Sequence, residues 1–201
     1  MPTTWLDTLI KQTRRIGDFP FPHQAAFLLD NPIRRFLTDP KTVIDQLKLT
    51  GHEQVLELGP GPGFYSVAIA RELTDGRLEL FDLQPQMLDK ARRKLDRAGC
   101  HNVDFRSGEA SAALPFADRT FDVAFLAAVI GEVPDKTACV RALADVLKPG
   151  GVLAFYEGVF DPDRFSVAQL RTLVEPEGFA FLDTAGNRWH DFVRFTRLET
   201  P

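Results

Sequence analysis

The chain is 201 residues long, 44% hydrophobic and 26% charged, with a formal net charge of −4, a balance that predicts one soluble domain with a full hydrophobic core. Because no lysine- or arginine-rich block is present, the charge disfavours nucleic acid as a partner. No apolar run is long enough to span a membrane, and the first residues lack the charged and apolar regions of a signal peptide, so we expect a cytoplasmic protein without membrane association.

The first 50 residues differ in texture from the rest of the chain. Apolar residues there recur at helical spacing, and prolines interrupt them. The pair Asp39 and Pro40 is typical of a helix start, and we expect that helix to run to about residue 49, where Gly51 follows. The pattern predicts a helical N-terminal extension or lid over residues 1–50, packed on a main domain at residues 51–201.

From residue 54 onward, apolar runs of strand length alternate with segments of helical periodicity. Strands separated by single helices imply a parallel sheet with right-handed crossovers. The last two strands flank a short turn expected at residues 185–187 and must be antiparallel, because a parallel return needs a dozen or more residues. The sequence thus predicts a doubly wound, mostly parallel α/β sheet of seven strands that ends in an antiparallel hairpin. The expected strands are 54–59, 77–82, 103–107, 121–127, 151–157, 179–184 and 191–198, and the expected helices are 63–73, 85–98, 135–147 and 166–175, with a weaker one near 109–113.

A glycine-rich turn follows the first strand. Gly59, Gly61 and Gly63 alternate with prolines, and glycine removes the Cβ where a ligand must approach the backbone. A dinucleotide site needs G-x-G-x-x-G, but Phe64 stands where its third glycine falls, which disfavours a nicotinamide oxidoreductase. No lysine follows, so the turn is not a P-loop either. The turn indicates either a nucleoside site or a tight strand–helix connection.

Three acidic residues follow or lie within the first strands. Glu57 sits inside an apolar strand, where a buried charge needs a partner, so it is either a structural acid bonded to backbone N–H groups or a group near the ammonium of a cofactor. Asp82 closes the second strand at the distance that brings a carboxylate to a ribose, although it could also cap the next helix. Glu109, after the third strand, faces an adenine amino group or is the first-turn acid of a short helix.

Several motifs follow one another over about residues 50–160: they are Val55-Leu-Glu-Leu-Gly-Pro-Gly-Pro-Gly63, Asp82, Gly108-Glu109-Ala110 with Leu114-Pro-Phe116, Phe121-Asp-Val-Ala124 and Leu147-Lys-Pro-Gly-Gly151. Their order resembles that of the class I S-adenosylmethionine-dependent methyltransferases. An N-terminal stretch, Phe27–Arg35, is similar to a small-molecule branch of that family akin to quinone and arsenite methyltransferases, the methyltransferase type 11-like proteins.

The resemblance implies S-adenosylmethionine as the cofactor and a Rossmann-like methyltransferase fold. It implies that Gly59, Gly61 and Gly63 line the methionine part of the cofactor and that Asp82 binds the ribose. It also implies that Leu83, Glu109 and Ala110 surround the adenine, and that Ala127 faces the methyl group. The chain lacks the Asn-Pro-Pro-Tyr segment of methyltransferases that act on DNA bases or glutamine, and its two distant cysteines, Cys100 and Cys139, do not form the thiol cluster of an arsenite methyltransferase.

Methyl transfer needs a base only when the acceptor loses a proton. We expect Glu132, after the fourth strand, or Glu157, at the end of the fifth, to fill that role, with no metal. The predicted acceptor is a small molecule of unknown identity. The alternatives are a methyltransferase acting on protein or RNA, and a non-catalytic S-adenosylmethionine-binding sensor or assembly protein. Nothing in the sequence predicts an oligomeric state.

Overall fold

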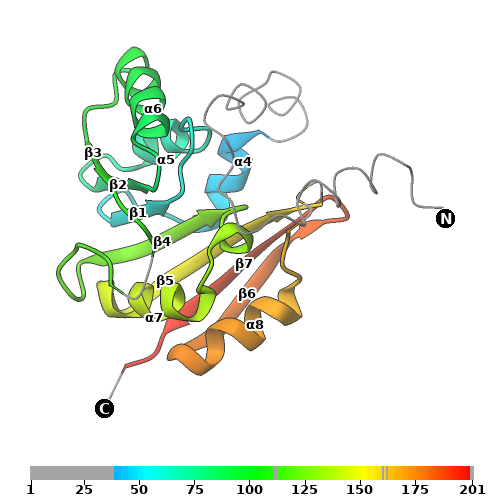
Figure 1. The fold of residues 1–201 in the computed structure, drawn as a ribbon. Helices are drawn as coiled ribbons and strands as arrows, with labels where there is room; N and C mark the ends of the chain where they lie inside the picture. The colour runs from blue at the N-terminus through cyan, green and yellow to red at the C-terminus, as the bar shows by residue number, and fades with distance from the viewer. Residues whose placement is uncertain (1–38, 111–112, 160, 162, 200–201) are drawn as a thin grey trace.

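The computed structural model describes residues 39–110, 113–159, 161 and 163–199, and every structural statement below concerns these residues (Figure 1). They form a seven-stranded sheet in the order β3-β2-β1-β4-β5-β7-β6, with helices on both faces. The predicted fold class is therefore confirmed. The strands are β1 (Gln54–Leu58), β2 (Arg77–Asp82), β3 (Val103–Ser107), β4 (Phe121–Ala127), β5 (Leu147–Gly158), β6 (Phe179–Asn187) and β7 (His190–Arg197).

The sheet is parallel from β3 across to β5 and then changes direction. β7 pairs antiparallel with both β5 and β6, as the short connection between the last two strands predicted. The turn of this hairpin, however, is Arg188–Trp189 and not the expected residues 185–187, since β6 continues to Asn187 and pairs there with His190. The turn of the hairpin therefore lies at the same end of the sheet as the carboxyl ends of the parallel strands (Figure 1).

Most of the predicted N-terminal extension lies outside the described residues. Within it, Asp39 caps α4 (Pro40–Ile44) by accepting the Lys41 N–H at 3.1 Å, as the sequence predicted. The α-helix is shorter than expected: it passes into the 3₁₀-turn η2 (Asp45–Leu47) and ends where Lys48 adopts a left-handed φ of 57°. A left-handed residue is a common way to end a helix.

The crossover helices agree with the predicted ones, except at the start of α5 and near residues 109–113. They are α5 (Ser66–Glu72), α6 (Pro85–Arg97), α7 (Lys136–Val146) and α8 (Val167–Val174), with 3₁₀-turns η3 (Ile130–Glu132) and η4 (Glu175–Glu177). α5 begins three residues later than expected because Gly63 has a φ of +76°, which a right-handed helix does not admit. The weak helix expected near 109–113 is not observed at 109, 110 or 113.

Two apolar cores cover the two faces of the sheet. Leu56 and Leu58 of β1 point toward α7 and α8, whereas Val55 points toward α4, α5 and α6. This alternation is the period of two of a strand buried on both faces. The strand order reverses between β1 and β4, so the loops after these strands diverge and leave a crevice at their carboxyl ends. None of the described helices is long and apolar enough to cross a membrane.

Candidate active site

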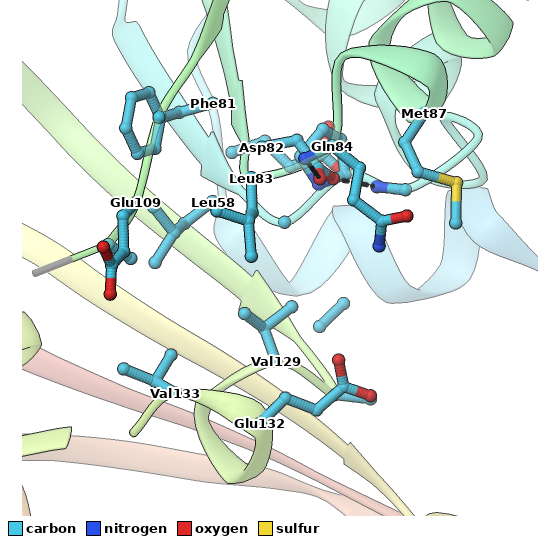
Figure 2. A pocket seen from close by; sticks show the side chains of 18 of the residues that line it. Leu58, Phe81, Asp82, Leu83, Gln84, Met87, Glu109, Val129, Glu132 and Val133 are labelled. Atoms are coloured by element: carbon cyan, nitrogen blue, oxygen red, sulfur yellow. Dashed lines mark hydrogen bonds between the residues drawn. The ribbon is translucent and has the colours of Figure 1, made fainter. Parts of the chain in front are cut away.

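A cavity of about 250 Å³ lies at that crevice, beyond the carboxyl ends of β1, β2 and β4. Its walls are the glycine-rich turn after β1, the segment after β2, residues 108–110 after β3, and the segment from Ala127 through η3 to Pro134. Figure 2 shows Asp82 and Leu83 across the cavity from Val129 and Glu132. Binding at this edge is what a doubly wound sheet favours.

The cavity brings together most of the residues that the sequence indicated. Leu83 is 49% exposed, a large apolar side chain open to a cavity and suited to the face of a flat ring. Two predicted residues, Gly63 and Glu157, do not line the cavity. Those that do are Glu57, Gly59, Gly61, Asp82, Leu83, Glu109, Ala110, Ala127 and Glu132.

Asp82 ends β2 with its carboxylate in the cavity wall. One oxygen accepts the Gly61 N–H at 3.0 Å and the other accepts the Gln84 N–H at 2.8 Å (Figure 2). Burial raises the pKa of this carboxyl, and the two N–H donors oppose that rise. Asp82 does not cap α6, because the N-cap residue of that helix is Gln84 and no side-chain capping hydrogen bond is formed there. A carboxylate has about four acceptor positions, so each oxygen keeps one for a diol in the cavity.

Glu57 is 2% exposed and has the partner that its burial demands. The Ser66 hydroxyl, at the start of α5, donates to it at 2.6 Å, so the partner is a side chain and not the backbone N–H groups that one interpretation proposed. Burial, and secondarily the charge of Asp82, raise the pKa of Glu57 to about 7, while the Ser66 hydroxyl and the Lys94 ammonium oppose the rise. A carboxyl with this pKa changes charge easily when a cation arrives in the cavity.

The glycines after β1 are required for two different reasons. A Cβ on Gly59 would lie 2.6 Å from a Val129 methyl carbon, and the φ of Gly59 is +67°, so the turn is packed directly against the segment after β4. A Cβ on Gly63 would lie 3.1 Å from Ala91, so the absence of a side chain at Gly63 allows α6 to pack closely against the turn. Gly63 therefore shapes the site from behind the cavity wall.

The segment after β4 forms the opposite wall. Ala128 adopts a left-handed φ of 58°, which is uncommon for a residue with a side chain, and its N–H donates to the Tyr156 carbonyl at 2.9 Å. This sharp bend carries the chain from β4 into η3 and turns Val129 toward Gly59. Backbone strain of this kind concentrates at functional sites.

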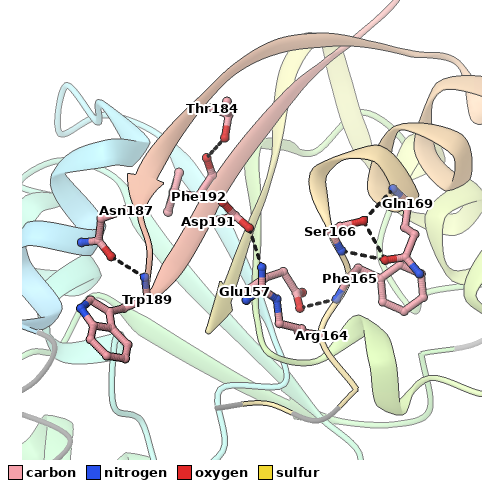
Figure 3. Close-up of polar contacts among 10 residues, drawn as sticks. All are labelled: Glu157, Arg164, Phe165, Ser166, Gln169, Thr184, Asn187, Trp189, Asp191 and Phe192. Atoms are coloured by element: carbon pink, nitrogen blue, oxygen red, sulfur yellow. Dashed lines mark hydrogen bonds and ion pairs between the residues drawn. The ribbon is translucent and has the colours of Figure 1, made fainter. Parts of the chain in front are cut away.

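Glu157 lies at the end of β5 and is 1% exposed. One carboxylate oxygen accepts the Phe165 N–H at 3.0 Å, while the ion pair between Arg164 and Asp191, at 2.9 Å, lies beside it (Figure 3). Burial raises its pKa to about 7. Glu132 lines the cavity, whereas Glu157 is not among the described residues that line it. The catalytic role predicted for either residue stays a prediction.

Several side chains that no sequence motif indicated complete the cavity. Phe64, which served only to exclude a dinucleotide, lines it beside Tyr65, and Gln84 and Met87 line it at the start of α6. Val129 also belongs to the cavity. The available signal was position: each of these residues lies within a few residues of the carboxyl end of a predicted strand.

Comparisons with known proteins agree with this geometry. A family model described as a methyltransferase domain matches residues 55–151. The chain is 30% identical over 157 residues to a probable methyltransferase, ltbC, of Aspergillus luteorubrus, covering 70% of this chain and 54% of that protein. It is 36% identical over 115 residues to the ubiquinone/menaquinone biosynthesis C-methyltransferase UbiE of Haemophilus ducreyi, covering 55% of this chain and 44% of that protein. The chain thus spans about half the length of these curated relatives.

A solved structure from Aquifex aeolicus, a SAM-dependent methyltransferase, superposes with a TM-score of 0.81 at 24% identity, covering 89% of this chain and 100% of that one. The sheet order, the cavity at its switch point and the carboxylate at the end of β2 are typical of nucleoside-binding α/β proteins. The matched family model and the curated relatives are methyltransferases, and the chain resembles the class I S-adenosylmethionine-dependent methyltransferases in sequence and in fold. S-adenosylmethionine is the cofactor of that family.

Proposed function

We propose that this protein transfers a methyl group from S-adenosylmethionine to a small-molecule acceptor. The observation that carries the proposal is Asp82, a buried carboxylate whose two oxygens are aligned by backbone N–H groups at the mouth of a cavity beside a glycine-rich turn. This arrangement suits the two hydroxyls of a ribose. The names of the relatives, a quinone-biosynthesis C-methyltransferase among them, support a small molecule as the acceptor.

The proposed binding mode distributes the cofactor over the cavity walls. Leu83, Glu109 and Ala110 would hold the adenine, since an exposed apolar side chain and an acceptor for an amino group adjoin there. Gly59 and Gly61 would lie along the methionine part. Glu57 would respond to the positive charge of the ligand through its raised pKa.

The methyl group would then face the wall that begins at Ala127. The bound cofactor supplies an activated methyl sulfonium, so the protein has to align the acceptor and exclude water. The small side chains of Ala127 and Ala128 leave room for the acceptor there. If the acceptor loses a proton, Glu132 is the base that this wall provides, because it also lines the cavity (Figure 2).

We further propose that the N-terminal residues up to about 50 form a lid that completes the acceptor side. The described part of this segment supports the proposal only through α4, which packs with α5 in the core on one face of the sheet. The acceptor would be enclosed between this segment and the wall after β4.

Calorimetric titration with S-adenosylmethionine, S-adenosylhomocysteine and NAD tests the cofactor site. Micromolar binding of the first two, without binding of NAD, is the expected result. Absence of all binding would overturn the proposal. Binding of the cofactor without methyl transfer in a broad screen of small phenols, amines and thiols would favour a non-catalytic cofactor-binding protein.

A further inference from the structure

Glu157 has an unusual environment for a residue outside the cavity. Its side chain is 1% exposed, one carboxylate oxygen accepts the Phe165 N–H at 3.0 Å, and its Oε1 is buried without a hydrogen-bond partner among the described residues. A buried unpaired oxygen is costly. Packing in the core therefore does not by itself explain a carboxylate at this position.

The N–H that Glu157 accepts belongs to Phe165, in the stretch 163–166 that the structure describes before α8 and that is called the β5–α8 loop below. The same stretch packs against η3: a Cβ on Gly131 would lie 2.4 Å from the Asp163 carbonyl oxygen and 2.8 Å from the Asp163 Cβ. The φ of Gly131 is not left-handed. Glycine is therefore required at this position by the close contact with the loop and not by its backbone conformation. The loop therefore supports η3 from outside.

η3 in turn carries one wall of the cavity. Val129, Glu132 and Val133 line it, and Val129 packs on Gly59 of the glycine-rich turn. A continuous set of contacts thus runs from Glu157 through Phe165 and Asp163 to Gly131 and the cavity. Contacts of this kind transmit a displacement because close-packed groups do not deform freely.

We infer that Glu157 is a positioning residue: by holding the β5–α8 loop against η3, it fixes the cavity wall that carries Val129 and Glu132. This inference uses the proposed function only to supply a ligand, S-adenosylmethionine, as a probe of the wall. It explains why an acid is buried at the end of β5 although it does not reach the cavity. Direct action as a base would instead require Glu157 to touch the acceptor.

The charges around Glu157 give the arrangement a dependence on pH. Asp161 and Arg164 face it from the loop, and Asp191 faces it from β7, where Asp191 is its register partner. Arg164 is engaged by Asp191 at 2.9 Å, so it does not fully compensate a second carboxylate. Burial raises the pKa of Glu157 to about 7. Once Glu157 is ionised, hydration of its carboxylate lowers the free energy of the buried charge. Water reaches the carboxylate when the loop is displaced.

A double-mutant cycle tests the set of contacts. Glu157→Ala removes the acceptor of the Phe165 N–H, and Gly131→Ala pushes the loop away from η3. We expect each variant to raise the Kd for S-adenosylmethionine about tenfold. The Kd of the double variant should be close to that of whichever single variant binds more weakly. Effects that multiply to about a hundredfold would mean that the two residues act independently and would overturn the inference. Glu175→Gln, which removes a partly exposed carboxylate paired with Arg171, is the matched control and should bind as the wild type does.

A second measurement needs no ligand. Hydrogen exchange followed by mass spectrometry should show faster exchange of the amides at 130–133 in Glu157→Ala, while exchange in the central strands stays unchanged. If the wild type fails to bind S-adenosylmethionine but this local exchange is seen, the proposed function fails and the positioning role stands. Exchange at 130–133 that matches the wild type would refute the positioning role.

Glu157→Gln distinguishes the effect of the hydrogen bond to the loop from the effect of the negative charge. It also replaces the alanine variant if that variant does not fold. Glutamine keeps an acceptor for the Phe165 N–H but does not ionise, so its affinity below pH 7 should match the wild type. Above pH 7 the wild-type Kd should rise relative to that of the variant, and a merely structural role would leave the ratio constant. Identical pH profiles from 6 to 8.5 would contradict the inference.

Discussion

Replacement of Asp82 tests the cofactor site at the carboxylate proposed to bind the ribose. Asp82 accepts two backbone N–H groups, from Gly61 at 3.0 Å and Gln84 at 2.8 Å, and is 8% exposed. Asp82→Ala removes the charged acceptor for the ribose, a loss of about 1–3 kcal/mol in cofactor binding, or roughly 5- to 150-fold in Kd. Calorimetry with S-adenosylmethionine measures this directly.

The same variant also releases the two N–H groups, so a loss of affinity has two sources. Asp82→Asn separates them, because the amide oxygen still accepts one N–H while the charge is gone. We expect Asp82→Asn to bind more weakly than the wild type and more tightly than Asp82→Ala. Urea unfolding of the ligand-free proteins then gives the structural part of the loss, which for two partly exposed backbone donors is about 1–2 kcal/mol.

Asp89→Asn is the matched control, because Asp89 is an exposed residue of α6. Its Kd should equal that of the wild type. The ribose-binding role of Asp82 is refuted if Asp82→Ala is folded and binds S-adenosylmethionine as tightly as Asp89→Asn does. In that case the carboxylate serves only to hold the turn and the start of α6.

Three further perturbations probe other parts of the site. Gly61→Val should abolish S-adenosylmethionine binding while the circular dichroism of the sheet persists, because Gly61 lines the cavity with a φ of +55°; normal binding would remove the turn from the site. The pKa of Glu57 is raised to about 7 from 4.5, so the folded state holds this proton more tightly than the unfolded state and the contribution of Glu57 to stability falls, by up to about 3 kcal/mol, as pH rises from 4.5 to 7. Glu57→Gln should flatten that part of the urea-unfolding profile, and an unchanged slope would contradict the raised pKa. Deletion of residues 1–35 should reduce turnover more than cofactor affinity if they complete the acceptor side; equal losses in both would count against a lid.

Local patterns determined most of the fold. The nearly continuous apolar runs at Val55 and Phe121 identify strands covered on both faces, and both become inner strands of the sheet. The short final connection required an antiparallel pair, which β6 and β7 form. Element ends were less predictable: the hairpin turn and the start of α5 each differ by a few residues, because strand pairing and a left-handed glycine decide them.

The candidate site was predictable to the extent that it follows strand ends. Glu57, Asp82 and Glu109 meet at one cavity because parallel strands place their carboxyl ends at the same edge. The contact of Gly59 with Val129, that of Gly63 with Ala91, and the separation of Glu157 from the cavity join residues distant in sequence. No local spacing encodes them, since they depend on how η3, α6 and the β5–α8 loop pack against a finished sheet. The sequence determined the strands and the edge at which the site lies; packing between distant segments decided which side chains face the cavity and which support it.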